Sequence, residues 1–254
     1  MVITSAAGTH VGKIRKNNED NYFLNGIYKT DCSENIRNDE SEDQKARNIY
    51  AVCDGVGGED AGELAALLAV EMLPEYESKD ILNYIKEANE GICNAIREHN
   101  GTRMGTTLAL LAIEDRTAEI YNIGDSRIYL FRTGSLQQLS KDHTKVQMMI
   151  DAGMLEQCEA RNSKQRHIIT QHLGIFPQEF IISPYIVRNI PVVAGDIFIL
   201  CSDGLTDMMD DSEIIKVLTN NADDCPEKIV NELISGSLDK GGKDNVTVVV
   251  VKVE

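Results

Sequence analysis

The chain has 254 residues, of which 42% are hydrophobic and 26% are charged, and it contains only 5 prolines. Its formal net charge of −16 at pH 7 would repel a phosphate backbone or an anionic bilayer, so we expect no nucleic-acid or membrane partner. This composition excludes a mainly disordered chain and predicts a single globular domain over residues 1–254. An acidic excess alone indicates only a solvated surface, so the positions of the acids must decide whether they have a function.

Cysteine usage and the N-terminus bear on the cellular compartment. The six cysteines form no CxxC pair and no zinc-like spacing. The N-terminus lacks the apolar run and the small-residue cleavage site of a signal peptide. No segment approaches the roughly 18 uninterrupted apolar residues of a spanning helix. These features predict a reduced, cytoplasmic protein.

In the first half of the chain, apolar runs predict strands at residues 2–4, 21–28 and 48–54. The polar stretch 30–47 predicts a surface hairpin tip or a mobile loop. Helices rich in alanine, leucine and isoleucine follow, and the first should stop at Pro74 because proline cannot continue a helix. We expect these helices at residues 61–73 and 79–98.

In the second half, three apolar runs with short breaks predict an antiparallel meander at residues 106–113, 118–123 and 127–132. A helix at 144–152 and a less regular stretch to about Gly174 come next. The remaining pattern predicts strands at 185–190 and 196–201, helices at 211–218 and 226–238, and a final strand at 246–253. Two sheets with helices outside them fit this order better than alternating βαβ units do.

Five short acidic motifs lie at strand ends or beside glycine: NNED (17–20), CDGVGGED (53–60), IGDSR (123–127), LCSDGLTD (200–207) and GGKDN (241–245). Each motif alone is more typical of a turn. Sheets can bring strand ends together, however, and carboxylates gathered in that way repel one another unless cations lie between them. Oxygen ligands favour Mg²⁺ or Mn²⁺ over zinc, and a pair of such ions can activate water against a phosphoryl group.

Other phosphatase chemistries leave signatures that this chain lacks. It contains neither the Cys-x5-Arg loop of the cysteine-based enzymes nor a DxDx[TV] phosphoaspartate motif. The acidic motifs are therefore the remaining candidates for phosphoryl chemistry.

Taken in order, RKNNED, DGVGG, GTTLALL, GDSRIYL, KDHT, SDGLTD and GGKDNVTVVVV resemble the motifs of the metal-dependent protein phosphatases of type 2C, in their compact bacterial form. The resemblance covers essentially the whole chain. It implies an α+β fold, a four-layer α/β/β/α sandwich of two antiparallel sheets flanked by helices. It also implies a serine/threonine phosphoprotein phosphatase that uses a water activated by two Mn²⁺ or Mg²⁺ ions. Phosphorylated proteins would be its substrates and a serine/threonine kinase its counterpart, and we expect a monomer.

Carried over to this sequence, the resemblance implies metal-binding roles, direct or through water, for Glu19, Asp20, Asp54, Gly55, Asp125, Asp203 and Asp244. Asp54 should bridge the two ions, and Asp125 should hold a third, weaker ion together with Asp203. Arg15 should grip the substrate phosphate with its planar fork of donors, a surface salt bridge being the alternative. Three polar residues are expected to support the site structurally: Thr106, Thr107 and Asn245.

Val56 departs from the family pattern, because animal members carry at this position a histidine proposed as the general acid. Valine cannot donate a proton, so a metal-bound water or another side chain must do so, and His143 is a speculative candidate beside its structural interpretation. Arg127 could pair with a ligand carboxylate or with surface acids.

The segment 145–173 aligns with the variable flap of the family. Its basic residues suggest recruitment of phosphorylated, acidic substrate segments, although a solvated loop is equally plausible: Arg161, Lys164, Arg166 and His167. The alternatives for the whole chain are a non-catalytic regulatory or binding module of the same fold, or a switch phosphatase that acts on one regulator protein.

Overall fold

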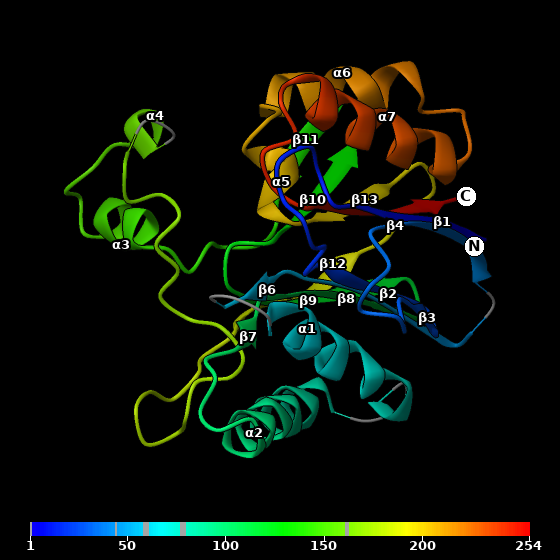
Figure 1. Cartoon of the computed structure of the whole chain (residues 1–254). Helices are drawn as coiled ribbons and strands as arrows, with labels where there is room; N and C mark the ends of the chain where they lie inside the picture. Colours follow the sequence, from blue (N-terminus) through cyan, green and yellow to red (C-terminus); the bar gives the residue numbers. More distant parts are fainter. Residues whose placement is uncertain (1, 44, 58–60, 77–79, 161–162) are drawn as a thin grey trace.

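The computed structural model describes residues 2–43, 45–57, 61–76, 80–160 and 163–254 (Figure 1). Two six-stranded sheets lie face to face, with helices on both outer sides. Sheet A has the order β11 (Ser135–Gln138), β10 (Arg127–Arg132), β13 (Ile197–Cys201), β14 (Val246–Val253), β1 (Ile3–His10) and β4 (Ile36–Asp43). All of its strand pairs are antiparallel.

Sheet B has the order β12 (Tyr185–Pro191), β9 (Thr117–Ile123), β8 (Leu108–Glu114), β5 (Arg47–Cys53), β2 (Asn21–Leu24) and β3 (Ile27–Tyr28). It is also antiparallel throughout. A separate two-stranded ladder joins β6 (Gly55–Val56) to β7 (Gly105–Thr106) and lies next to the end of β5.

The helices form two outer layers and a lateral projection (Figure 1). Sheet B is covered by α1 (Gly62–Glu71) and α2 (Ile81–Glu98), with the 3-10 helix η1 (Leu73–Tyr76) between them. Sheet A is covered by α5 (Asp203–Thr206), α6 (Asp211–Asn220) and α7 (Pro226–Asp239). To one side project α3 (Lys145–Asp151) and α4 (Gln157–Ala160). No helix in the described ranges is long and apolar enough to cross a bilayer.

Three hydrophobic clusters hold the layers together. One lies between α1, α2 and sheet B and includes Ala65, Ile92 and Leu110. The second fills the space between the sheets, and the third packs α6 and α7 against sheet A. Burial of aliphatic side chains on both faces explains why β14, with the sequence VTVVVVKV, is apolar at nearly every position. The predicted four-layer sandwich is confirmed.

The prediction of a hairpin tip or mobile loop at residues 30–47 was wrong for the central part of this stretch, residues 36–43. Eight of these residues form β4, which pairs along the whole of β1 at the edge of sheet A. One side of an edge strand is unpaired, and charged side chains on such a strand discourage pairing with other chains. The composition of an edge strand can therefore resemble that of a loop. Arg37 Nε donates to Asp39 Oδ2 at 2.5 Å, and Tyr22 from sheet B also donates to Asp39.

Other element boundaries differ by smaller amounts. The predicted strand at 21–28 is a hairpin of β2 and β3, since Asn25 and Gly26 turn the chain with positive φ of 51° and 116°. The predicted strand at 106–113 is divided between β7 and β8. The first strand is longer than predicted, and β11, α4 and α5 were not predicted. Lys79, the predicted start of the second helix, lies outside the described residues.

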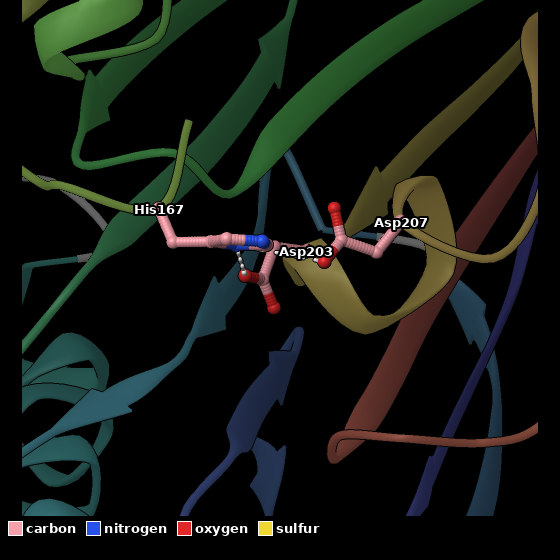
Figure 2. A group of neighbouring side chains, drawn as sticks. All are labelled: His167, Asp203 and Asp207. Carbon is pink, nitrogen blue, oxygen red and sulfur yellow. Dashed lines mark ion pairs between the residues drawn. The ribbon is translucent and has the colours of Figure 1, made fainter. Parts of the chain in front are cut away.

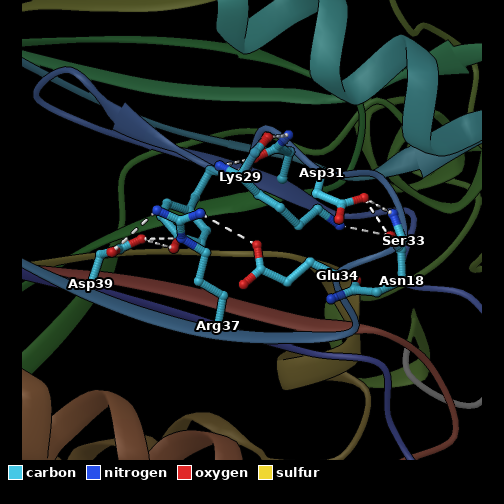
Figure 3. Close-up of polar contacts among 9 residues, drawn as sticks. Asn18, Lys29, Asp31, Ser33, Glu34, Arg37 and Asp39 are labelled. Carbon is cyan, nitrogen blue, oxygen red and sulfur yellow. Dashed lines mark hydrogen bonds and ion pairs between the residues drawn. The ribbon is translucent and has the colours of Figure 1, made fainter.

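A buried lysine after β3, Lys29, connects the β2–β3 hairpin to the acidic loop before β2. Lys29 is 2% exposed, and its Nζ donates to the Asn18 carbonyl at 2.8 Å (Figure 3). The Asn21 side chain bonds both backbone groups of Lys29, at 2.9 and 3.1 Å. Burial lowers the pKa of Lys29. These bonds fix the backbone immediately before Glu19 and Asp20.

Candidate metal centre

Asp54 stands at the end of β5, and its main chain is fixed from both sides. Its N–H donates to Thr107 Oγ1 at 2.9 Å, and its carbonyl accepts from Thr107 N at 2.9 Å and from Thr106 Oγ1 at 3.0 Å. Thr107 Oγ1 also bonds Ser126 Oγ at 2.7 Å. Thr106 and Thr107 thus hold the strand end in place, the supporting role expected for them, and leave the Asp54 carboxylate outside this network.

Asp20 is the most buried acid of the cluster, with 1% exposure. Its Oδ2 accepts from Ser202 Oγ at 2.8 Å and from Thr247 Oγ1 at 2.7 Å. Its Oδ1 is buried and has no hydrogen-bond partner among the described residues. A buried oxygen without a partner costs free energy, and a cation would satisfy it.

Asp244 and Asn245, which precede β14, lie beside the acidic loop that carries Glu19 and Asp20. Asn245 Oδ1 accepts from Glu19 N at 2.9 Å, and its Nδ2 donates to the carbonyls of Val11 and Asn17, each at 2.9 Å. Asn245 therefore has the supporting role predicted for it. Asp244 lies next to it in the chain.

Arg15 makes an ion pair with Asp244, from Nη2 to Oδ2 at 2.8 Å. Hydrogen bonding to Asp244 raises the pKa of Arg15, and the charges of Glu19 and Asp54 raise it further. Arg15 therefore lies beside the acidic cluster, and its side chain remains 54% exposed.

The clustered carboxylates disturb one another's titration. Burial raises the pKa of Asp20 to about 7, assisted by the charges of Asp203 and Asp244. Burial and the charges of Asp20 and Asp203 raise the pKa of Asp54 well above its usual range. Burial and the charge of Asp203 raise the pKa of Asp125 to about 8. Motifs that are distant in sequence thus bring their acids within electrostatic reach of one another.

The chemistry of this cluster fits divalent cations. Its side-chain donors are carboxylates, the set that Mg²⁺ and Mn²⁺ prefer. Cations would relieve the mutual repulsion and would satisfy the orphaned Asp20 oxygen. Gly55 belongs to the same corner, since a Cβ there would lie 2.6 Å from the Glu19 carbonyl oxygen.

A cavity of about 520 Å³ opens beside Asp125 and Asp203. From the segment 145–173, predicted to be a flap, Arg166 and His167 line this cavity. Arg166 Nη2 lies 3.4 Å from Asp207 Oδ2, and His167 lies against Asp203 and Asp207 (Figure 2). Two of the predicted basic flap residues thus face the acids; Lys164 is exposed, and Arg161 lies outside the described residues.

Sequence reasoning did not single out Asp207. The spacing of Asp203 and Asp207, four residues apart in SDGLTD, is the signal that could have found it, because a helical turn places such side chains on one face.

The structure answers two open questions about neighbouring residues. Arg127 pairs with Asp142 through Nε at 3.0 Å and Nη2 at 2.6 Å, and so not with a predicted metal ligand. His143 Nδ1 accepts from Gly124 N at 3.1 Å, and burial lowers the pKa of the ring. These contacts favour the structural interpretation of His143 over the role of general acid.

Comparison with known proteins identifies the family. A family model described as Protein phosphatase 2C matches residues 34–233. The chain belongs to the protein phosphatase 2C family. PstP of Mycobacterium tuberculosis, a serine/threonine protein phosphatase, is 32% identical over 100% of this chain and 45% of its own length. The protein phosphatase PhpP of Streptococcus pneumoniae is 33% identical over 96% of this chain and 94% of its own. The chain thus spans about half of PstP and nearly all of PhpP.

Solved structures of this family share the fold. A crystal structure of the M. tuberculosis phosphatase matches with a TM-score of 0.83 and 30% identity, over 100% of both chains. A second structure, the catalytic domain of PstP in complex with two manganese ions, matches with a TM-score of 0.78 and 30% identity over 100% of this chain and 99% of that chain. The predicted family is confirmed.

The affinity of this 2C-family chain for a divalent cation is expected to fall as the pH drops below 7. Each proton that competes with the cation should lower this affinity about tenfold per pH unit. The raised pKa values of Asp20 and Asp125 mean that the metal-free fold holds protons that a cation must displace. Because these values lie above those of the unfolded chain, they favour the metal-free fold at low pH, and this advantage is lost as pH rises towards 7 and 8. Bound cations should reverse that trend.

Calorimetric titration with Mn²⁺ at about pH 6 and about pH 8, in buffers of different ionisation enthalpy, measures both affinity and proton release. Equal affinity at the two pH values, with no proton released, would contradict the electrostatic account of the cluster.

Proposed function

We propose that this chain is a metal-dependent serine/threonine protein phosphatase, which hydrolyses phosphoserine and phosphothreonine in proteins. The observation that carries the proposal is the convergence of Asp20, Asp54, Asp203 and Asp244, whose mutual repulsion divalent cations would relieve. Membership of the 2C family supports it, as do the relatives named as protein phosphatases. The manganese in the related PstP structure supports Mn²⁺, with Mg²⁺ as the other suitable ion.

The residues proposed to hold the ions, directly or through water, are Glu19, Asp20, Asp54, Gly55, Asp125, Asp203 and Asp244. When bound, the ions supply an activated water and positive charge for the phosphoryl oxygens. The chain's own contribution is to fix the ligands in advance: two threonines hold Asp54, and the hydroxyls of Ser202 and Thr247 orient Asp20. Displacement on phosphorus needs no protein nucleophile.

Two further residues bear on the substrate. Arg15 pairs with Asp244 through Nη2 only, and its half-exposed guanidinium has further donors that could bind a phosphate. Val56 cannot donate a proton, so the leaving alkoxide takes its proton from water or from another group.

The test is hydrolysis of a phosphothreonine peptide by the purified protein, with Mn²⁺ and with EDTA. We expect activity that requires the metal and resists thiol-blocking reagents. Inactivity towards several phosphopeptides, when calorimetry shows that Mn²⁺ is bound, would favour a non-catalytic module or a phosphatase restricted to one regulator protein.

Changing Arg15 to alanine is expected to raise KM for the phosphopeptide by about tenfold or more, since charged hydrogen bonds are worth about 1.5–3 kcal/mol. Lysine should recover only part of this loss, because it keeps the charge but not the fork of donors. Steady-state kinetics on the two variants, with Mn²⁺ titration as a control for the metal centre, would check this. An unchanged KM would leave Arg15 only its ion pair with Asp244.

We also propose that the chain acts as a single monomeric domain over residues 1–254, with a flap at 145–173. The same proposal places it in the cytoplasm, opposite a serine/threonine kinase and without nucleic-acid or membrane partners. Support comes from the net charge of −16 and from six cysteines that are all free. Light scattering on the purified chain and retention on anionic vesicles or DNA would test these points.

A further inference from the structure

A buried series of polar side chains ends at Asp20. Asn18, Thr9 and Thr247 are each 0% exposed, and Asp20 is 1% exposed. Asn18 Nδ2 donates to Thr9 Oγ1 at 2.8 Å, and Thr9 Oγ1 lies 2.6 Å from Thr247 Oγ1. Thr247 Oγ1 in turn bonds Asp20 Oδ2 at 2.7 Å. Side chains from β1, from the loop before β2 and from β14 thus form one continuous series of hydrogen bonds.

The direction of these bonds follows from the number of protons available. An ionised Asp20 can only accept, so the single proton of the Thr247 hydroxyl points to Asp20 Oδ2. Thr247 must then accept from Thr9, and Thr9 in turn accepts from the Asn18 amide. Every donor therefore points towards Asp20, and hydrogen bonds aligned in this way polarise and strengthen one another.

The amide of Asn18 cannot be flipped to reverse this series. Its Oδ1 accepts from the main-chain N–H of Asp20 at 3.2 Å, and its Nδ2 also donates to the Asn35 carbonyl at 3.2 Å. A flipped amide would set oxygen against oxygen at Asn35 and N–H against N–H at Asp20. Lys29 Nζ holds the carbonyl of Asn18 as well (Figure 3). Asn18 is therefore fixed as the first donor of the series.

The two carboxylate oxygens of Asp20 consequently differ. Oδ2 accepts from Thr247 Oγ1 and also from Ser202 Oγ, at 2.8 Å. Oδ1 is buried and has no hydrogen-bond partner among the described residues. The series thus fixes the rotation of the carboxylate and leaves one oxygen available to a cation. A ligand that is oriented in advance binds its ion more tightly.

We propose that Thr9 and Asn18 are positioning residues of the metal centre, which act on Asp20 through the hydroxyl of Thr247 and raise the affinity for Mn²⁺ or Mg²⁺. In the described part of the chain, neither side chain contacts the Asp20 carboxylate itself. The inference rests on the proposed function, because it takes Asp20 as a metal ligand. It goes beyond that function because Thr9 lies on β1, outside every acidic motif.

The alternative is that these side chains only stabilise the contact between β1 and β14. Thr9 lies directly opposite Thr247 in that pair of strands. The neighbouring pair, Gly8 with Val248, has no side-chain hydroxyl, so the strands pair without one. Valine keeps the β-branched shape of threonine and removes only the hydroxyl, and it can therefore separate the two roles.

The test is a double-mutant cycle on Mn²⁺ affinity, measured by calorimetry on the full chain. Thr247→Val removes a hydroxyl bonded directly to Asp20 and should lower the affinity about 10–100-fold. Thr9→Val should lower it about tenfold, whereas Thr9→Ser keeps the hydroxyl and should bind Mn²⁺ like the native chain. In the Thr247→Val background, Thr9→Val should have a much smaller effect, because its route to Asp20 is already broken.

Thr4→Val is the matched control, because Thr4 lies on the same strand opposite Lys252, at the end of the strand pair away from Asp20. It should leave the Mn²⁺ affinity unchanged. Thr9→Ala removes the same hydroxyl with a smaller side chain and takes the place of Thr9→Val if valine prevents folding. Native affinity in the folded Thr9 variant would overturn the proposal, and so would equal losses from Thr9→Val in the two backgrounds.

Failure of this proposal is distinguishable from failure of the proposed function. If the chain hydrolyses phosphopeptides in Mn²⁺ and its Thr9 variants bind Mn²⁺ normally, the positioning role is rejected and the phosphatase remains. If the Mn²⁺ affinity depends on Thr9 in a chain without hydrolytic activity, the positioning role is retained and the phosphatase is rejected.

Discussion

Asparagine in place of Asp54 is expected to lower phosphopeptide hydrolysis by about 10³-fold or more, the scale of effect seen when a central charge-stabilising group is lost. The substitution should leave the strand end intact, because Thr106 and Thr107 bond only the main chain of Asp54. The amide that replaces the carboxylate would keep an oxygen donor but lose the negative charge that holds the cations. Steady-state kinetics at saturating Mn²⁺ would measure the loss.

The same substitution should make the metal-free chain more stable. The pKa of Asp54 is raised because its ionised form is disfavoured by burial and by Asp20 and Asp203. A neutral amide removes that penalty, so the melting temperature in EDTA should rise by roughly a few degrees. In Mn²⁺ the order should reverse, since the native chain binds the ions more tightly.

The control is Asp223→Asn, which changes an exposed acid remote from the cluster and should alter neither activity nor melting temperature. An Asp54→Asn variant that retains hydrolysis would reject the central role of Asp54. If the Asp54→Asn variant is less stable than the native chain in EDTA, the ionised Asp54 carboxylate does not destabilise the metal-free fold.

Alanine at Gly204 is expected to destabilise the fold by about 3 kcal/mol or more. A Cβ at this position would lie 1.9 Å from the Asn245 carbonyl oxygen and 2.9 Å from its carbon. Both atoms belong to the main chain and cannot rotate away. Relief of the clash would displace α5 from the start of β14 and thereby separate Asp203 from Asp244. Activity should fall together with stability.

Gly91→Ala is the matched control, because Gly91 lies within α2 and its nearest neighbour to a new Cβ is Met72 Sδ at 3.7 Å. Alanine there should stabilise the protein by about 0.5–1 kcal/mol, since glycine is a poor helix former. Urea unfolding of the two variants compares them directly. Similar midpoints would mean that α5 and β14 accommodate the extra methyl group.

The sequence predicted best the features that depend on a local pattern. Apolar runs located most strands, and acids at strand ends indicated a cluster that the structure brings within electrostatic reach. It failed for β4, whose charges are typical of a loop although its backbone pairs with β1. Pairing is a long-range property, and an edge strand lacks the alternation of a half-buried one.

Contacts between segments distant in the chain were also beyond the sequence. Nothing local in the flap indicates that His167 faces Asp207, because that depends on how the flap folds over α5. The partner of Arg127 depended likewise on the position of Asp142 across a turn.

The pairing of β1 with β14 has a consequence for synthesis of the protein. Ile3 lies opposite Val253 and His10 opposite Val246, so β1 cannot complete its pairing until β14 has been synthesised. Asp20 also takes one of its hydrogen bonds from Thr247 in that strand. Until β14 leaves the ribosome, sheet A lacks the strand that joins β13 to β1, and Asp244, which directly precedes β14, has not reached the other acids. The proposed phosphatase activity would therefore begin only after β14 has left the ribosome and paired with β1.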